Sequence, residues 1–380
     1  GAPQSGKRPV LLAARNAHKA LLYAAALLDF DIRWLWPSAQ AEGALCSCPV
    51  TAEALTGALH AMAQQGNTPF GVYVTSPDYL GGVQDIPALA AVCRAQGVPL
   101  LVDNAHGAYL RFLPQNCHPI AQGAAMCCDS AHKTLPVVTG GAYLHLAHDA
   151  PVQDEAAVRG ALALFGSTSP SYLILQSLDA CNAVLAGDYP RRLVQCCAAL
   201  EGLRRSLNKT AAARQCPVPL AVAGAQQEPM KLTLDAAALG CTGIALAEAL
   251  RRAQMECEYA DPRYVVLMFT PENPPQDFER LQTALEQLLA AVPAGLPRPE
   301  NRAGEFSALQ QQAVQRCTIR QAVLGAQVRI PVHKALGRVC AMPTVSCPPA
   351  IPVAVSGEEI TPAAIALMQR YGIEELSVLR

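Results

Sequence analysis

The sequence has few charged residues, and their signs are balanced. Only 16% of the 380 residues are Asp, Glu, Lys or Arg, against roughly 25% in an average globular chain. Hydrophobic residues make up 51%, which argues against intrinsic disorder. Lys and Arg together number 29 and Asp and Glu 30, so the formal net charge is −1. Because there is no positive excess and no basic block, we expect no nucleic-acid partner.

Long apolar segments are also lacking. No apolar run reaches the ~18–20 residues that cross a bilayer. The most apolar early stretch, Ala20–Leu28, ends at Asp29. Arg15, His18 and Lys19 interrupt any signal-peptide core near the start. We therefore expect no membrane partner.

Cysteines are present, but not in the spacing of a disulfide scaffold or a metal site. Their number, 15, is odd and they are scattered along the chain, which predicts reduced, mostly buried thiols and a cytoplasmic location. The close pairs at 46 and 48, 127 and 128, and 196 and 197 have no matching Cys or His pair at zinc-ligand spacing. The sequence therefore predicts no metal.

Strand-like and helix-like segments alternate through the first 150 residues. Strands are predicted at 10–14, 32–36, 70–75, 98–102, 124–128 and 142–146, and helices at 18–28, 51–65 and 85–96. The nearly all-apolar run VPLLV (98–102) is typical of a strand covered on both faces. The pattern predicts an α/β fold, with a mostly parallel sheet between helices. Ligands of such sheets bind beyond the carboxyl ends of the strands.

Three regions are expected along the chain. A major domain at 1–215 ends in a largely helical stretch, and Pro217 and Pro219 mark the junction that follows it. A small α/β domain is predicted at 216–298, closed by the proline-rich linker PAGLPRP. The remainder, 299–380, reads as a C-terminal α+β segment.

An aspartate and a lysine follow two of the predicted strands. Asp103 comes directly after VPLLV, and Lys133 follows the 124–128 strand. An amine and a carboxylate at neighbouring strand ends suit pyridoxal 5′-phosphate (PLP): the amine binds the aldehyde and the carboxylate keeps the pyridine nitrogen protonated. Ser130 and His132 are placed to donate hydrogen bonds to the phosphate. On spacing alone, a surface lysine and a strand-end aspartate are the commoner explanation.

Two histidines lie at similar positions. His18 follows the first predicted strand and is a candidate to stack on the pyridine ring, or is simply the first residue of a helix. His106 follows Asp103 and is a candidate to hydrogen-bond the phenolic oxygen of PLP, or simply sits in a turn. The joint placement of these residues after several strand ends favours the PLP interpretation.

Six segments carry a resemblance to a known family. They are, in chain order, ARNAHKALLYA (14–24), VTSPDYLGGVQDIPALAAVC (74–93), PLLVDNAHGAYLRF (99–112), DSAHKTLPVVTGGAYLH (129–145), FGSTSPSYLILQSLD (165–179) and CPPAIPVAVSGEEI (347–360). In content and order they resemble the Orn/Lys/Arg decarboxylase family of fold-type-I PLP enzymes. The resemblance covers nearly the whole chain.

The resemblance implies a set of cofactor contacts. Lys133 would be the Schiff-base lysine, and Asp103 would pair with the pyridine nitrogen. His18 would stack on one face of the ring and Ala105 would pack near the other. Ser130 and His132, named above for the phosphate, match family positions with that role.

It also implies a partner and a substrate class. In such enzymes the STSP segment reaches the cofactor of a neighbouring subunit, so Thr168 and Ser169 would act in trans in a homodimer or larger homo-oligomer. Glu358 would lie near the substrate entrance, where a carboxylate suits a distal ammonium or guanidinium.

The sequence departs from the family pattern at two places. No Gly/Ser/Thr phosphate-binding loop or N-terminal arm is recognised before Arg15, which suggests a fragment or a shortened homologue. Cys347, Ala350 and Ser356 stand where an aromatic residue, a glycine and a proline are expected.

The predicted function is PLP-dependent decarboxylation of lysine, arginine or ornithine to the amine and CO2. Lys133 and His106 are the candidates for the group that protonates Cα. One alternative is another PLP reaction, such as aminotransfer or elimination. A second is a non-catalytic homologue that serves as a regulatory or interaction subunit.

Overall fold

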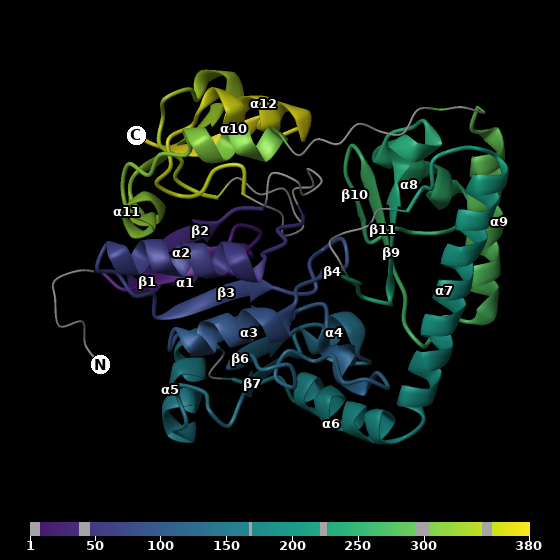
Figure 1. Cartoon of the computed structure of the whole chain (residues 1–380), viewed down its shortest axis with the longest axis horizontal. Coiled ribbons are helices and arrows are strands. Elements are labelled where there is room, and N and C mark those ends of the chain that lie inside the picture. The colour runs from purple at the N-terminus through teal and green to yellow at the C-terminus, as the bar shows by residue number, and fades with distance from the viewer. Residues whose placement is uncertain are drawn as a thin grey trace.

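A computed structural model describes residues 8–37, 46–166, 169–220, 226–293, 296, 304–343 and 352–380 (Figure 1). A six-stranded sheet forms the centre of the N-terminal half. The strands, in spatial order, are β2 (Asp31–Leu35), β1 (Val10–Ala14), β3 (Gly71–Thr75), β5 (Leu100–Asp103), β6 (Met126–Asp129) and β7 (Tyr143–Leu146). All neighbours run parallel except β6 and β7, which are antiparallel. The prediction of a mostly parallel α/β sheet is confirmed.

Helices cover this sheet because its strands are apolar on both faces. Successive side chains of a strand point to opposite faces. Leu12 and Ala14 of β1 pack in one core cluster with residues of α2 (Ala52–Gln64) and α3 (Ile86–Ala95). Leu11 and Ala13 pack in another cluster with α1 (Lys19–Leu28). The sheet is therefore enclosed between two layers of helix.

Local signals set the ends of these helices. The Thr51 hydroxyl accepts a hydrogen bond from the Ala54 N–H, and the Asp85 carboxylate accepts one from Ala88. Gly97, at φ +66°, follows α3 in the left-handed conformation that glycine adopts without strain. Two shorter turns follow strands of the sheet: η1 (Ala108–Phe112), a 3-10 turn, and α4 (Ala131–Thr134).

A run of three helices leads from the sheet to a second layered unit. The helices are α5 (Glu155–Phe165), α6 (Tyr172–Ala186) and α7 (Tyr189–Ala213), and they confirm the predicted helical stretch. The unit contains β9 (Lys231–Asp235), β10 (Tyr259–Ala260), β11 (Tyr264–Met268), α8 (Gly243–Arg252), α9 (Pro275–Ala291) and the 3-10 turn η2 (Ala236–Leu239). Its three strands form an antiparallel sheet in the order β10-β11-β9. The short strands β4 (Gly82–Val83) and β8 (Gln226–Gln227) pair separately.

The long helix α7 packs against α9 (Figure 1). Leu193, Leu200 and Leu207 lie seven residues apart on α7 and share a core cluster with Leu281 and Leu285 of α9. A spacing of seven returns to nearly the same face of a helix, so α7 presents one continuous apolar stripe. The domain boundaries at 215 and 298 stay a prediction.

The C-terminal segment contacts α1 through one of its helices, α11 (Ile319–Leu324). Its elements are α10 (Gly304–Gln312), α11 (Ile319–Leu324), β12 (Gln327–Pro331), η3 (Val332–Lys334), α12 (Pro362–Arg370) and β13 (Glu375–Leu379), with β12 and β13 antiparallel. Ile319 joins the cluster that contains Leu22. Arg320 donates hydrogen bonds to the carbonyls of Ala26 and Leu27 in the last turn of α1. This segment therefore anchors the end of α1 whose start carries His18.

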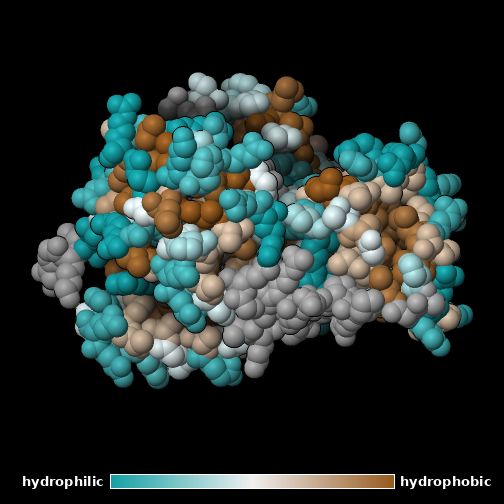
Figure 2. Space-filling model, turned by 90° about the horizontal axis from the view of Figure 1, so that it is seen from above, coloured by the Kyte–Doolittle hydropathy of each residue, from teal (hydrophilic) through white to brown (hydrophobic). Residues whose placement is uncertain are grey.

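The surface reflects the low share of charged residues. In the view of Figure 2, hydrophobic patches lie between hydrophilic residues on the exposed face. Among the described residues, no helix combines the length and the apolar character needed to cross a membrane.

Candidate active site

The carboxyl ends of β1, β3, β5 and β6 meet at one edge of the sheet because these strands are parallel. The segments that leave them are tied together by hydrogen bonds. The Ser76 N–H donates to the Asp103 carbonyl at 3.0 Å, and the Asn104 N–H donates to the Cys128 carbonyl at 2.9 Å. The Thr75 hydroxyl donates to the Asn16 carbonyl at 3.4 Å. Residues far apart in sequence thus share one small region.

Asp103 is buried at this edge with its carboxylate held from two sides. The Tyr73 hydroxyl donates to Oδ2 at 2.9 Å, and the Ala105 N–H donates to Oδ1 at 3.1 Å. Tyr73 keeps its proton, since burial and then the Asp103 charge raise its pKa well above the ordinary value. The carboxylate is therefore fixed in orientation rather than free to rotate.

Lys133 and His106 are in direct contact. Lys133 lies on α4, just after β6, and its Nζ is 3.3 Å from Nε2 of His106 in the turn after β5. Burial, followed by the charges of Lys231 and Lys133, lowers the pKa of His106 well below its ordinary value. The imidazole is therefore neutral, and its Nε2 lies within hydrogen-bonding distance of the Lys133 amine. Tyr79 packs edge-on against the same ring, with 5.0 Å between the ring centroids.

His18 is the residue at the start of α1. This is the position that the simpler of its two sequence interpretations gives it. Its Nδ1 accepts a hydrogen bond from the Ala20 N–H at 3.2 Å. Burial lowers the pKa of His18. The charge of Asp103 acts to raise that pKa, and the charge of Lys133 acts to lower it. The structure thus brings together the imidazole, the carboxylate and the amine that sequence analysis singled out.

The predicted phosphate contacts lie on the turn that carries Lys133. Ser130 takes the N-cap position of α4, but its hydroxyl does not cap that helix. Nδ1 of His132 lies 3.0 Å from the Gly141 carbonyl, which fixes the ring. Ser169 is an exposed residue between α5 and α6, whereas Thr168 lies outside the described residues.

Glu358 forms an ion pair within the chain. It is buried, and its two carboxylate oxygens accept from Nη1 and Nη2 of Arg15 at 2.7 and 2.8 Å. The Val355 N–H donates to the same carboxylate at 2.9 Å. In this structure the cation beside Glu358 is Arg15, and a place for Glu358 near the substrate entrance stays a prediction.

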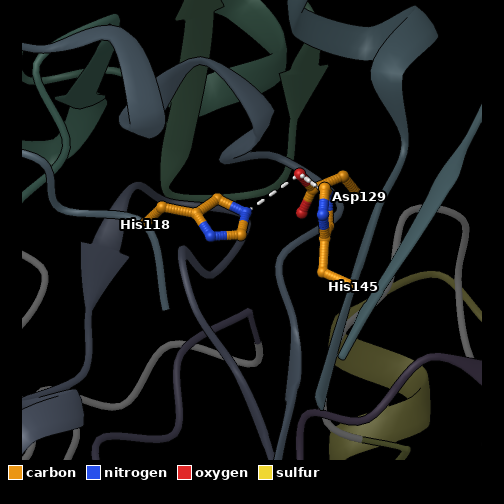
Figure 3. Close-up of side chains that lie close together, drawn as sticks. All are labelled: His118, Asp129 and His145. Atoms are coloured by element: carbon orange, nitrogen blue, oxygen red, sulfur yellow. Dashed lines mark hydrogen bonds and ion pairs between the residues drawn. The ribbon is translucent and has the colours of Figure 1, made fainter. Parts of the chain in front are cut away.

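Sequence analysis missed two features near the site. Tyr73 was treated only as part of a strand, although it is the aromatic residue in an otherwise small or aliphatic β3. The second feature is a contact between Asp129 and two histidines (Figure 3): Nε2 of His118 lies 3.1 Å and Nε2 of His145 3.0 Å from Oδ2 of Asp129. Burial alone would raise the pKa of Asp129, but these hydrogen bonds hold it below its ordinary value. The spacing of the three residues in sequence carries no known signature.

The groups at this edge fit PLP by their chemistry. Lys133 offers an amine for the aldehyde, Asp103 a carboxylate for the protonated ring nitrogen, and His18 a flat ring. Two buried polar groups nearby, Nδ1 of His106 and the side-chain amide of Asn16, have no hydrogen-bond partner among the described residues. Buried polar groups normally have a partner, so a polar ligand at this place would complete their hydrogen bonds.

Comparison with known proteins places the chain in one family. Residues 5–227 match the model of the Orn/Lys/Arg decarboxylase major domain. The chain is 27% identical over 361 residues to an arginine decarboxylase of Bacillus subtilis, covering 92% of this chain and 70% of that protein. It is 26% identical over 368 residues to the uncharacterized protein YaaO of the same organism, covering 95% of this chain and 73% of that protein.

Solved structures share the fold. The constitutive lysine decarboxylase of Escherichia coli has a TM-score of 0.72 at 19% identity, with 98% of this chain and 67% of that chain covered. The lysine decarboxylase LdcF of Francisella novicida has a TM-score of 0.74 at 17% identity, with 100% and 67% covered. At these identities the likeness concerns the fold alone.

Proposed function

Because the chain belongs to the Orn/Lys/Arg decarboxylase family, a family of PLP-dependent amino acid decarboxylases, we propose that it decarboxylates a basic amino acid. The substrate is lysine, arginine or ornithine, and PLP is bound through Lys133. The observation that carries the proposal is the convergence of Lys133, Asp103, His18 and His106 at one edge of the sheet. These four residues lie within the stretch matched by the family model.

The chain's own residues bind and orient the cofactor. When bound, PLP supplies an electron sink for the bond that breaks. Asp103 would keep a proton on the pyridine nitrogen, and the Tyr73 and Ala105 donors hold that carboxylate in place. His18 would lie against the ring. The family resemblance implies three further contacts. Ala105 would pack near the other face of the ring, and Ser130 and His132 would bind the phosphate.

Proton handling falls to the Lys133–His106 pair. Loss of CO2 from an amino acid consumes one proton, which must reach Cα. The neutral imidazole of His106 lies 3.3 Å from Nζ of Lys133, within reach of a hydrogen bond that would orient the amine. Lys133 and His106 are the two candidates for the group that would deliver this proton to Cα.

A homodimer is part of the proposal. None of the residues of α5 is buried within the chain, and Leu164 at its end is 80% exposed. Tyr172, at the start of α6, is 84% exposed. An exposed apolar surface of this kind favours a protein partner, and Ser169 lies between these two residues. Together with Thr168, Ser169 is proposed to contact the cofactor of the partner subunit.

We propose Glu358 as a carboxylate near the substrate entrance, as the family resemblance implies. Because Arg15 neutralises it, its effect on a substrate cation would be weak. A cytoplasmic location stays a prediction, as does the division at residues 215 and 298.

The test is a product assay on the full chain with PLP added. We expect CO2 and amine from at least one of lysine, arginine and ornithine. Lys133→Ala should abolish both the products and the absorbance band that PLP gains when bound to a lysine amine. Lys209→Ala, at an exposed position of α7, is the matched control and should keep both.

Two outcomes would contradict the proposal. Keto-acid formation without CO2 would favour an aminotransferase. No PLP binding by the full chain would favour a non-catalytic subunit.

A further inference from the structure

We propose that His118, Asp129 and His145 form a Zn²⁺-binding site beside β6 and β7. Both imidazoles point at the carboxylate of Asp129 (Figure 3). One ligand atom from each residue lies within 4.8 Å of the others. The site is independent of the proposed decarboxylase activity.

The separations suit an ion between these atoms. In tetrahedral zinc sites with bonds of about 2.0–2.1 Å, neighbouring ligand atoms are roughly 3.3 Å apart. Here Nε2 of His118 and Nε2 of His145 lie 3.1 and 3.0 Å from Oδ2 of Asp129. Zn²⁺ can therefore take the place of the two hydrogen bonds to the carboxylate after a small movement of the side chains.

Binding requires a tautomer change but no net loss of a proton from the imidazoles. Without the ion, a proton on each Nε2 faces Asp129. With it, each neutral ring carries its proton on Nδ1 instead. For His118 this gives up one long hydrogen bond, in which Nδ1 accepts from the Ile120 N–H at 3.4 Å. That bond is near the limit of a hydrogen bond and is weak.

Strand pairing and a neighbouring amide side chain hold Asp129 and His145 in place. Asp129 ends β6 and His145 lies on β7, the antiparallel neighbour in which His145 is opposite Cys127. The Asn104 amide donates to Oδ1 of Asp129 at 2.7 Å and so orients Oδ2 toward the histidines. Hydrogen bonds of this kind are what fixes ligands in metal sites.

The choice of zinc follows from the donor types. Two imidazole nitrogens and one carboxylate suit Zn²⁺, whereas Mg²⁺ and Ca²⁺ prefer oxygen ligands. A water molecule from the adjoining cavity is available as the fourth ligand.

A cavity gives the ion a route in. The three residues line a space of about 620 Å³, whose wall also carries Arg111 and Asn116. Asp129 is only 3% exposed, but the side chain of His145 is 37% exposed. Arg111 places a positive charge on the cavity wall, which repels cations. The three ligand atoms, and not the charge of the cavity as a whole, would therefore hold the ion.

The experiment is a Zn²⁺ titration of the full chain after removal of metal with a chelator. A chromophoric competitor reports binding, and Co²⁺ gives a visible absorbance that reports nitrogen, oxygen or sulfur ligation. We expect one ion per chain and a higher thermal midpoint with Zn²⁺. His145→Ala and Asp129→Asn should each weaken binding at least ~10-fold.

Two variants separate this site from the other histidines and thiols. His148→Ala changes an exposed histidine three residues further along and should bind like the unaltered chain. Cys128→Ser removes the exposed neighbouring thiol and should also retain binding. The proposal is overturned if the unaltered chain binds no stoichiometric ion, if His145→Ala binds equally well, or if Cys128→Ser alone abolishes binding.

Discussion

The Tyr73 hydroxyl donates a 2.9 Å hydrogen bond to Oδ2 of Asp103. The two residues lie on adjacent parallel strands, with Tyr73 opposite Leu101 and Thr75 opposite Asp103 in the β3–β5 register. Tyr73 lies two residues before the end of β3, and from there its side chain reaches the Asp103 carboxylate. The charge proposed to hold the ring proton of the cofactor has a fixed orientation because of this neighbour.

Removing the Tyr73 hydroxyl should slow turnover without unfolding the protein. Tyr73→Phe deletes one hydrogen bond to a charged group, worth about 1.5–3 kcal/mol. We expect kcat to fall roughly 10- to 100-fold, with KM nearly unchanged. Steady-state kinetics at saturating PLP measure both constants. Tyr23→Phe, at a half-buried position of α1, is the control, and equal kcat values for the two variants would contradict the role given to Tyr73.

Neutralising Asp103 should have a larger effect. Asp103→Asn keeps the shape of the side chain but removes the negative charge that holds the ring proton. We expect PLP to bind, as judged by its absorbance, while kcat falls at least ~100-fold, or about 3 kcal/mol in the activation barrier. Turnover within threefold of the unaltered enzyme would rule out Asp103 as the partner of the pyridine nitrogen.

Burial of neutral His106 should make stability depend on pH. Its pKa in the folded chain is well below the ordinary value of 6.5. As the pH falls below 6.5, the unfolded chain takes up a proton on this side chain and the folded chain does not, so the free energy of unfolding decreases. His106→Gln should reduce that decrease. Urea unfolding at pH 7 and pH 5 measures it.

The comparison needs a second histidine variant. His60→Gln changes an exposed residue of α2 and should unfold like the unaltered chain at both pH values. If the free energy of unfolding changes equally with pH in His106→Gln and His60→Gln, the buried neutral His106 does not contribute to the pH dependence of stability.

Breaking the Arg15–Glu358 pair should destabilise the fold strongly. Both side chains are buried, and the guanidinium also lies over the rings of Trp34 and Trp36 at 5.0 and 4.5 Å. Removing one charge leaves the other buried without a partner, which costs about 3–5 kcal/mol. Glu358→Gln should therefore lower the thermal midpoint markedly.

The next residue provides the matched control. Glu359 pairs with Arg316 at a much more exposed position, and exposed pairs contribute only ~0–1 kcal/mol. Glu359→Gln should leave the thermal midpoint nearly unchanged. Equal effects of the two substitutions would show that burial does not set the strength of the Arg15–Glu358 pair.

The sequence by itself determined the local architecture. The strand at VPLLV, the caps at Thr51 and Asp85 and the stop at Gly97 all act within a few residues. The order of strands and helices followed from the same short-range patterns. Because parallel strands end at a common edge, the residues after those strands, including Asp103 and Lys133, were identifiable before any coordinates were known.

The tertiary structure decided which side chains meet. Glu358 pairs with Arg15 across 343 positions of sequence, and Asp129 meets His118 and His145 through the register of β6 on β7 and the loop before them. No short-range pattern encodes such contacts. They depend on how the C-terminal segment and the sheet edge pack once the apolar faces are buried, and packing acts between residues that are close in space but not in sequence.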